Sequence, residues 1–142
     1  MAELTQITPF VRVSDMDRAV SFYSSVLGFS VGFRGYDPDY AFLRRDQAAI
    51  RLLIAGDNID MSHPSAQQTV YIDVRDVDGL YTELEPQLGT LPKGRVRAPF
   101  DQSYGQRELH VIDEDTTLLM FGERIAGHPG QRQTPPEPNE TN

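Results

Sequence analysis

The chain has 142 residues, no cysteine and a formal net charge of −8 at pH 7, with an isoelectric point near 4.7. This length is sufficient for one domain with a real core, and the absence of cysteine excludes disulfides and thiolate metal sites. An acidic chain disfavours nucleic acid as a partner but can attract a cationic ligand. No signal-peptide pattern or membrane-span length of apolar residues is present, which predicts a cytoplasmic protein.

The first predicted elements are a strand at residues 7–13 and a helix at 16–26. In the strand, Ile7 and two valines alternate with other residues, which is typical of a strand with one face on the core. Asp15 is well placed to cap the helix, whose apolar residues recur at helical spacing. Gly28 is expected to end the helix.

The remaining segments repeat this order of elements. Further strands are predicted at residues 29–34, 40–44 and 49–54, followed by a polar linker at 55–68. The second half is expected to contain a strand at 69–74, a helix at 77–88 capped by Asp76, and strands near 94–98, 107–112 and 117–121. Pro86 lies in the last turn of the helix and predicts a kinked or frayed end.

The segment from Thr8 to Gly28 recurs 61 positions later, from Thr69 to Gly89, without a gap. An ungapped match that keeps both the strand and the helix pattern indicates two copies of one supersecondary unit. We therefore predict an α+β fold of two β-α-β-β-β modules, within a single domain. The modules are expected at about residues 6–55 and 69–123, the domain at 1–125, and a disordered proline-rich tail at 126–142.

Three stretches carry a resemblance to a known family. They are VSDMDRAVSFYSSVLGF at 13–29, VRDVDGLYTEL at 74–84 and YGQRELHVIDEDTTLLMF at 104–121. These stretches resemble the vicinal oxygen chelate superfamily, which contains glyoxalase I, fosfomycin-resistance enzymes, extradiol dioxygenases and bleomycin-resistance proteins. The resemblance implies the glyoxalase/bleomycin-resistance fold, in which each module forms a cupped mixed sheet with its helix outside and a cleft inside.

Metal-dependent members of this superfamily hold their ion at four positions. Carried over to this sequence, the positions are Thr8, Arg51, Thr69 and Met120. Hydroxyls are weak ligands, arginine is a fixed cation and methionine is a soft thioether, so this set is unsuited to a hard divalent ion. We therefore expect no metal and no other cofactor, and the resemblance narrows to the bleomycin-resistance branch.

Members of that branch are acidic dimers that bind a bulky cationic glycopeptide, without chemistry, in clefts between subunits. The resemblance thus implies a metal-free homodimer that binds a small aromatic or cationic molecule, such as a bleomycin-type antibiotic, with no nucleic-acid or membrane partner. The predicted ligand-binding residues are Phe10, Arg51, Tyr71, Asp73, Tyr104, Arg107, Glu108, His110 and Met120.

The charged residues in this set leave the ligand open. Asp73 and Glu108 offer carboxylates to a cation, whereas Arg12, Arg51 and Arg107, if they point inward, favour an anion or pair with those acids.

Two other functions stay open at this point. The chain could be a lyase, isomerase or dioxygenase of the same superfamily acting on an unknown small molecule. Glu108 and His110 are then the candidates for proton transfer, because they lie two residues apart on one predicted strand. The third alternative is a regulatory or partner-binding module in which the cleft has no catalytic use.

Overall fold

The two halves of the chain fold into the same series of elements, and the computed structural model describes residues 1–128. The first half contains β1 (Phe10–Val13), α1 (Met16–Ser21), the π-helical η1 (Phe22–Val26), β2 (Ser30–Tyr36), β3 (Asp39–Arg45) and β4 (Ala48–Ile54). A short 3-10 turn, η2 (Pro64–Ala66), lies in the linker. The second half contains β5 (Thr69–Asp73), α2 (Val77–Leu88), β6 (Val96–Asp101), β7 (Gln106–Ile112) and β8 (Leu118–Arg124).

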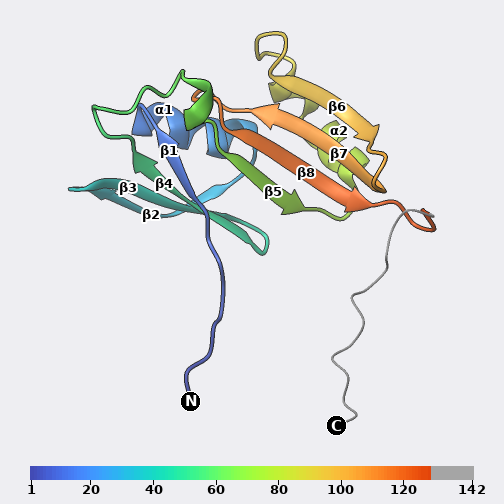
Figure 1. Cartoon of the computed structure of the whole chain (residues 1–142), viewed down its shortest axis with the longest axis horizontal. Helices are drawn as coiled ribbons and strands as arrows, with labels where there is room; N and C mark the ends of the chain where they lie inside the picture. The colour runs from blue at the N-terminus through green and yellow to red at the C-terminus, as the bar shows by residue number, and fades with distance from the viewer. Residues whose placement is uncertain (129–142) are drawn as a thin grey trace.

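Each half forms its own four-stranded mixed sheet (Figure 1). The strand order is β1-β4-β3-β2 in the first sheet and β5-β8-β7-β6 in the second. In both sheets the first strand of the module runs parallel to the last, and the remaining neighbours are antiparallel. The α+β fold of two β-α-β-β-β modules is therefore confirmed.

The hydrophobic core lies between the helices and one face of each sheet. Val11, Leu43 and Leu52 of the first sheet are completely buried, as are Leu109 and Leu119 of the second. The buried residues of both modules belong to one continuous cluster, to which the helices contribute their apolar sides. No helix of residues 1–128 combines the length and apolar character that crossing a membrane needs.

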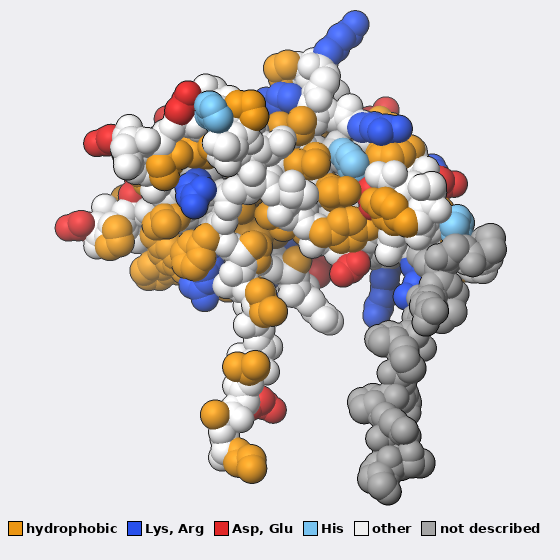
Figure 2. Space-filling view, in the orientation of Figure 1, with side chains coloured by type: hydrophobic (Ala, Val, Ile, Leu, Met, Phe, Trp, Pro, Cys, Tyr) orange, Lys and Arg blue, Asp and Glu red, His pale blue; other side chains and the backbone are white. Residues whose placement is uncertain are grey.

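The opposite face of each sheet has no helix over it, and we call it the open face. The backbone register and the alternation of burial assign its residues. On the first sheet the open face carries Phe10, Arg12, Phe33, Tyr40, Phe42, Arg44, Arg51 and Leu53, and on the second Tyr71, Asp73, Glu108, His110 and Met120. Figure 2 shows hydrophobic side chains gathered over both sheets, with charged groups among them.

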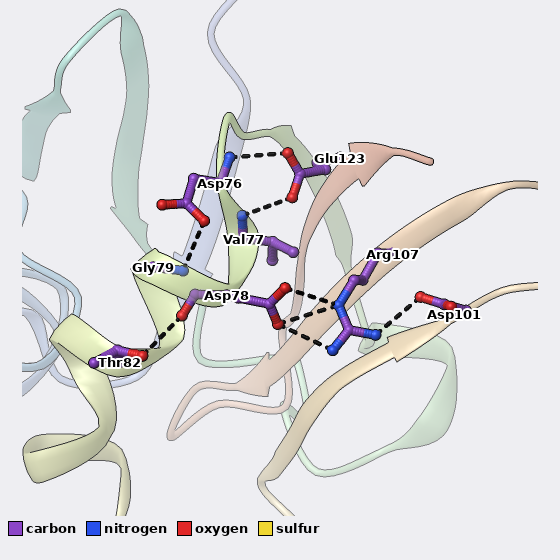
Figure 3. A network of polar contacts seen from close by, with 8 residues as sticks. All are labelled: Asp76, Val77, Asp78, Gly79, Thr82, Asp101, Arg107 and Glu123. Carbon is purple, nitrogen blue, oxygen red and sulfur yellow. Dashed lines mark hydrogen bonds and ion pairs between the residues drawn. The ribbon is translucent and has the colours of Figure 1, made fainter. Parts of the chain in front are cut away.

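Both predicted helix caps are confirmed. The carboxylate of Asp15 accepts a hydrogen bond from the amide of Arg18, and that of Asp76 accepts one from the amide of Gly79, each at 3.0 Å. A carboxylate oxygen of this kind satisfies an amide that has no partner within the helix. The sequence did not indicate a second support for α2, in which Glu123 of β8 accepts from two more amides at its start (Figure 3).

Two strand boundaries differ from the prediction. β1 begins at Phe10 rather than at residue 7, and Ile7 is 94% exposed in an extended N-terminal arm (Figure 1). Pro9 has no amide hydrogen, so it cannot donate to β4 and the ladder ends there. β6 extends to Asp101, into the segment that was predicted to be a loop. The prediction ended the strand too early, because a register shift around Pro99 on this edge strand interrupts the alternation in the sequence.

Other predicted boundaries agree more closely. The strand predicted from residue 69 begins at Thr69, and α2 passes through Pro86 to Leu88. The predicted helix at 16–26 is observed, but its second half is π-helical. From residue 129 onward, the predicted disordered tail lies outside the described residues.

A buried hydrogen bond joins the two modules. The hydroxyl of Tyr23 in η1 donates to a carboxylate oxygen of Asp113, at the turn between β7 and β8, over 2.7 Å. The other oxygen of Asp113 accepts from the amides of Asp115 and Thr117, which holds that turn in place. Burial raises the pKa of the Asp113 carboxyl group, although these hydrogen bonds oppose the shift. The helix of one module is thereby anchored to the last hairpin of the other.

We predict that Tyr23→Phe lowers the free energy of unfolding by about 1–3 kcal/mol, because it leaves a buried carboxylate oxygen without its donor. Urea denaturation followed by circular dichroism measures the change. Tyr36→Phe is the matched control, since Tyr36 is 76% exposed. Equal stability of the two variants would contradict a linking role for Tyr23.

Candidate functional site

The structure divides the predicted ligand-binding residues between the two sheets. Phe10 and Arg51 lie on the open face of the first sheet. A second group lies on or beside the open face of the second sheet, and it consists of Tyr71, Asp73, Tyr104, Glu108, His110 and Met120. Arg107 lies on the helix side of β7 and is separate from both groups.

Backbone register brings the second group together. Met120 of β8 lies opposite Tyr71 of β5 on one side and His110 of β7 on the other. Side chains that are directly opposite in neighbouring strands share a face and touch, so these three form a row across the sheet.

The next row contains Asp73, Gly122 and Glu108. A Cβ at Gly122 would lie 1.8 Å from the hydroxyl oxygen of Tyr71, so only glycine leaves room for that phenol.

Glu108 is the centre of this group. Its side chain is fully buried, yet its carboxylate accepts hydrogen bonds from Gln102 Nε2 at 3.0 Å and the Tyr104 hydroxyl at 2.5 Å. His110 Nε2 lies 2.8 Å from the same carboxylate, and its ring meets Phe100 edge-on with 4.9 Å between centroids. A buried carboxylate surrounded by this many donors is stabilised by charge-assisted hydrogen bonds.

The protonation states follow from this arrangement. Burial acts to raise the pKa of Glu108, but hydrogen bonds from Tyr104, His110 and Gln102 outweigh it and the pKa is lowered. Burial and hydrogen bonding to Glu108 raise the pKa of Tyr104 to about 12, and they raise that of Tyr71 as well. Near neutral pH, Glu108 is therefore an anion and both phenols are neutral donors.

These contacts limit what Glu108 can do. Its lone pairs already face protein donors, so binding a cation or accepting a substrate proton requires it to give up one of them. The arrangement instead holds Tyr104 and His110 in fixed positions at the edge of the open face. Asp73 is different, because it is exposed and has no hydrogen bond or ion pair to residues 1–128. It is the carboxylate on this wall that remains available to a ligand.

Arg107 is held on the opposite side of its strand. Its guanidinium donates to Asp78 of α2 at 3.0–3.1 Å and to Asp101 of β6 at 2.9 Å (Figure 3). These carboxylates raise the pKa of Arg107 further. The side chain thus ties α2 to the second sheet and does not reach the open face. The sequence left open whether Arg107 binds an anionic ligand or pairs with acids of the chain. In the structure it pairs with acids, but these are Asp78 and Asp101 rather than Asp73 or Glu108.

The four positions that would hold a metal do not fit one. Arg51 Nε donates to Thr8 Oγ1 at 2.7 Å, and its guanidinium also donates to the Tyr40 hydroxyl. A fixed cation in this position repels a divalent ion and occupies the threonine oxygen. The other two positions, Thr69 and Met120, offer a hydroxyl and a thioether. Among residues 1–128, no three His, Asp or Glu side chains lie close enough together to hold a metal.

Several residues of the site were missed by the sequence analysis. Gln102 and Phe100 belong to the stretch assigned to a loop, where the bulged strand β6 and the turn before β7 place them against Glu108 and His110. Gly105 is a turn residue, and in the structure its φ is 91°. This glycine was the signal in the sequence that could have placed Gln102 and Tyr104 in a turn before β7.

Two surface hollows lie on the part of the chain that the structure describes. One surface hollow lies between Gly28, Arg44 and Glu83, and another beside Arg12 and His63. Neither of these two is lined by Glu108 or His110.

The family described as Glyoxalase/Bleomycin resistance protein/Dioxygenase superfamily matches residues 4–121. Bleomycin resistance proteins of Geobacillus stearothermophilus and Staphylococcus aureus are each 26% identical over 136 residues, which covers 86% of this chain and 98% of theirs.

Solved structures show the same fold at low identity. A bleomycin resistance determinant encoded on transposon Tn5 has a TM-score of 0.69 at 22% identity, covering 85% of this chain and 98% of its own. A bleomycin-binding protein complexed with bleomycin gives the same score and identity, with 85% and 99% covered. TnmS3, an antibiotic binding protein from Streptomyces sp. CB03234, has a TM-score of 0.64 at 19% identity, with 87% and 99% covered.

We predict that Glu108→Gln destabilises the fold by about 1–3 kcal/mol at pH 7, because the new amide group faces donors. The folded-state pKa of Glu108 is lowered, so its contribution is present above the ordinary pKa of glutamate, about 4.3, and is lost as the pH falls through the folded value. Thermal melts between pH 3 and 7 should show the difference from wild type shrinking in acid. Glu85→Gln, on the exposed side of α2, is the control, and an equal loss in both variants would rule out the role of Glu108.

Proposed function

The chain belongs to the glyoxalase/bleomycin resistance protein/dioxygenase superfamily, and we propose that it binds a small molecule without metal and without chemical conversion. Sequestration of an antibiotic of the bleomycin type is one form of this function. Relatives with the same fold include proteins described as bleomycin-binding and antibiotic binding.

The contact between Arg51 and Thr8 is the observation that carries the proposal. Thr8 and Arg51 are two of the four positions at which metal-dependent relatives hold an ion. Here the Arg51 guanidinium, a cation, already donates a hydrogen bond to the Thr8 hydroxyl. Lewis-acid chemistry needs exchangeable positions on a metal, and a guanidinium has none. The remaining features of the face serve contact with a ligand rather than reaction.

The open face supplies suitable surface for such contacts. Tyr71 is 40% exposed and lies beside the flexible side chain of Met120, and Tyr104 is 50% exposed. Aromatic and thioether groups adapt to flat apolar ligands. Asp73 adds an available carboxylate on the same wall, which favours a ligand that is aromatic, cationic or both.

We propose further that the protein is a homodimer in which each open face is covered by the second subunit. Phe10, Phe33 and Leu53 are exposed large apolar residues on the first sheet. Leu4 and Ile7 extend this apolar surface along the arm at residues 1–9. An apolar surface of this extent marks an interaction site, and the arm is long enough to lie on a partner.

An enzyme of the same superfamily is the second candidate. The hydrogen-bonded pair of Glu108 and His110 favours it, since such a pair can move a proton. The lowered pKa of Glu108 makes it a weaker base, however, and its donors occupy it. Binding without turnover therefore remains the function that the geometry supports better.

We predict that bleomycin raises the melting temperature equally with and without EDTA. At a free concentration 100 times the dissociation constant, the stabilisation is about 2.7 kcal/mol. Mass spectrometry of the recovered drug should find it unchanged. A product whose formation stops in His110→Ala would favour the enzyme instead.

The same assay tests the available carboxylate. Asp73→Asn should weaken bleomycin binding by up to about fivefold, because an exposed ion pair contributes up to about 1 kcal/mol. Asp57→Asn, in the exposed linker, should leave the affinity unchanged. If the two substitutions have equal effects, Asp73 does not contact the ligand.

We predict a dimer in sedimentation equilibrium, weakened at least tenfold by Ile7→Asp. Burying an isoleucine contributes about 1.5–3 kcal/mol, and a carboxylate removes that gain. Glu3→Gln, in the same arm, is the control. A monomer at all concentrations would contradict the dimer, and a dimer unaffected by Ile7→Asp would exclude the arm from the interface.

A further inference from the structure

The open face of the first sheet is free of acidic residues, although the chain as a whole has a charge of −8. Arg51 occupies its centre, directly opposite Phe10 on β1 and Phe42 on β3. The neighbouring open-face positions hold Leu53 and Ala49 along the same strand. A fixed positive charge therefore lies in an aromatic and aliphatic surface.

Unlike four other arginines of this protein, Arg51 has no carboxylate partner among residues 1–128. The arginines at positions 18, 34, 45 and 107 each form an ion pair with a carboxylate. Arg51 is half-buried, and within residues 1–128 its guanidinium donates only to the neutral hydroxyls of Thr8 and Tyr40. Its charge is thus partly desolvated and has no counter-ion there, which makes an anionic partner favourable.

The orientation of Arg51 is set before any ligand arrives. Thr8 and Tyr40 hold two of its nitrogens, and the ring of Phe42 lies 4.9 Å from the guanidinium carbon. Five donors are available on a guanidinium, so these contacts leave others for a planar anion. Because the group is already ordered, binding costs little additional side-chain entropy.

A second arginine adds to the charge. Arg44 is exposed on the same face and lies 5.5 Å from the ring of Phe42, also without an ion pair in the described chain. Arg12 belongs to the face as well. Arg12 lines a hollow with Asp60, and Arg44 lines one with Asp46 and Glu83, whereas Arg51 lines neither. The charge of Arg51 is therefore the least offset of the three.

We propose that this face binds a planar aromatic group that carries an anion, such as an aromatic carboxylate, phenolate or sulfonate. The anion pairs with Arg51, and the ring packs on Phe10 and Phe42. The inference rests on the proposed function, since it assigns the ligand chemistry of one wall of the same binding surface. A cationic group of a ligand would face Asp73 on the second sheet. The anion at Arg51 and the cation at Asp73 therefore belong to opposite ends of the ligand.

Single-stranded nucleic acid also combines flat rings with negative charge. Its binding depends on neutralising several phosphates along a basic groove. Here the acidic chain offers a small basic area around Arg51 and Arg44, and the surrounding charge repels a polyanion. A small molecule with one or two charges is the better match.

The test uses three matched probes in calorimetric titrations of the full chain at low salt. They are 2-naphthoate, the neutral 2-naphthamide and the cationic 2-naphthylmethylammonium. We expect naphthoate to bind most tightly and to weaken as salt is added, because salt screens the charge. Binding of the amide as tight as that of the acid would overturn the proposal.

Variants locate the anion site. Arg51→Met should lower naphthoate affinity about tenfold or more, and Arg51→Lys should lower it less, because lysine keeps the charge but loses the planar fork. Arg44→Met, at an exposed position with no ion pair in residues 1–128, should lower it severalfold even if Arg51→Met disturbs folding. Arg18→Met, on the helix side, is the matched control and should bind as wild type.

The remaining outcomes separate this inference from the proposed function. A decathymidine oligonucleotide that binds more tightly than naphthoate would overturn the inference in favour of nucleic acid. If Arg51→Met and Arg44→Met bind naphthoate as wild type does, the anion does not pair with these arginines and the inference fails. Bleomycin binding without naphthoate binding retains the proposed function alone, whereas failure of both probes removes both.

Discussion

One-sided burial of the two sheets is the constraint on which the rest of the structure depends. Each module has one helix, and that helix covers only one face of a four-stranded sheet. The bond between Tyr23 and Asp113 fixes the modules to each other on the covered side. The other side is left with aromatic residues and charges in ordered positions, and this is where we propose that a ligand or a second subunit binds.

The two open faces treat charge in opposite ways. On the second sheet, the charge of Glu108 is satisfied by protein donors, so its effect is to fix its neighbours. On the first sheet, Arg51 is fixed by neutral hydroxyls and has no counter-charge among residues 1–128. Burial alone therefore does not identify a binding residue. What decides is whether the protein already supplies the counter-charge.

The fold could be predicted because the repeat between Thr8 and Thr69 contains both a strand and a helix pattern. The local caps followed from single residues such as Asp15. The site was predictable only where strand alternation holds, as for His110. Arg107 lies apart from the rest of the expected group, because Asp78 and Asp101 hold it on the helix side, and the sequence does not show where these acids lie. Gln102 was missed because a bulge in β6 interrupts the alternation.

Arg51 also relates this chain to its metal-dependent relatives by charge. A divalent ion in this fold would present positive charge to the open face, and the guanidinium presents positive charge from the same position without an ion. The guanidinium keeps the attraction for an anionic oxygen but lacks exchangeable coordination positions, so it can orient a ligand and cannot activate it as a Lewis acid. The contact between Arg51 and Thr8 is therefore compatible with the proposed anion recognition without a metal.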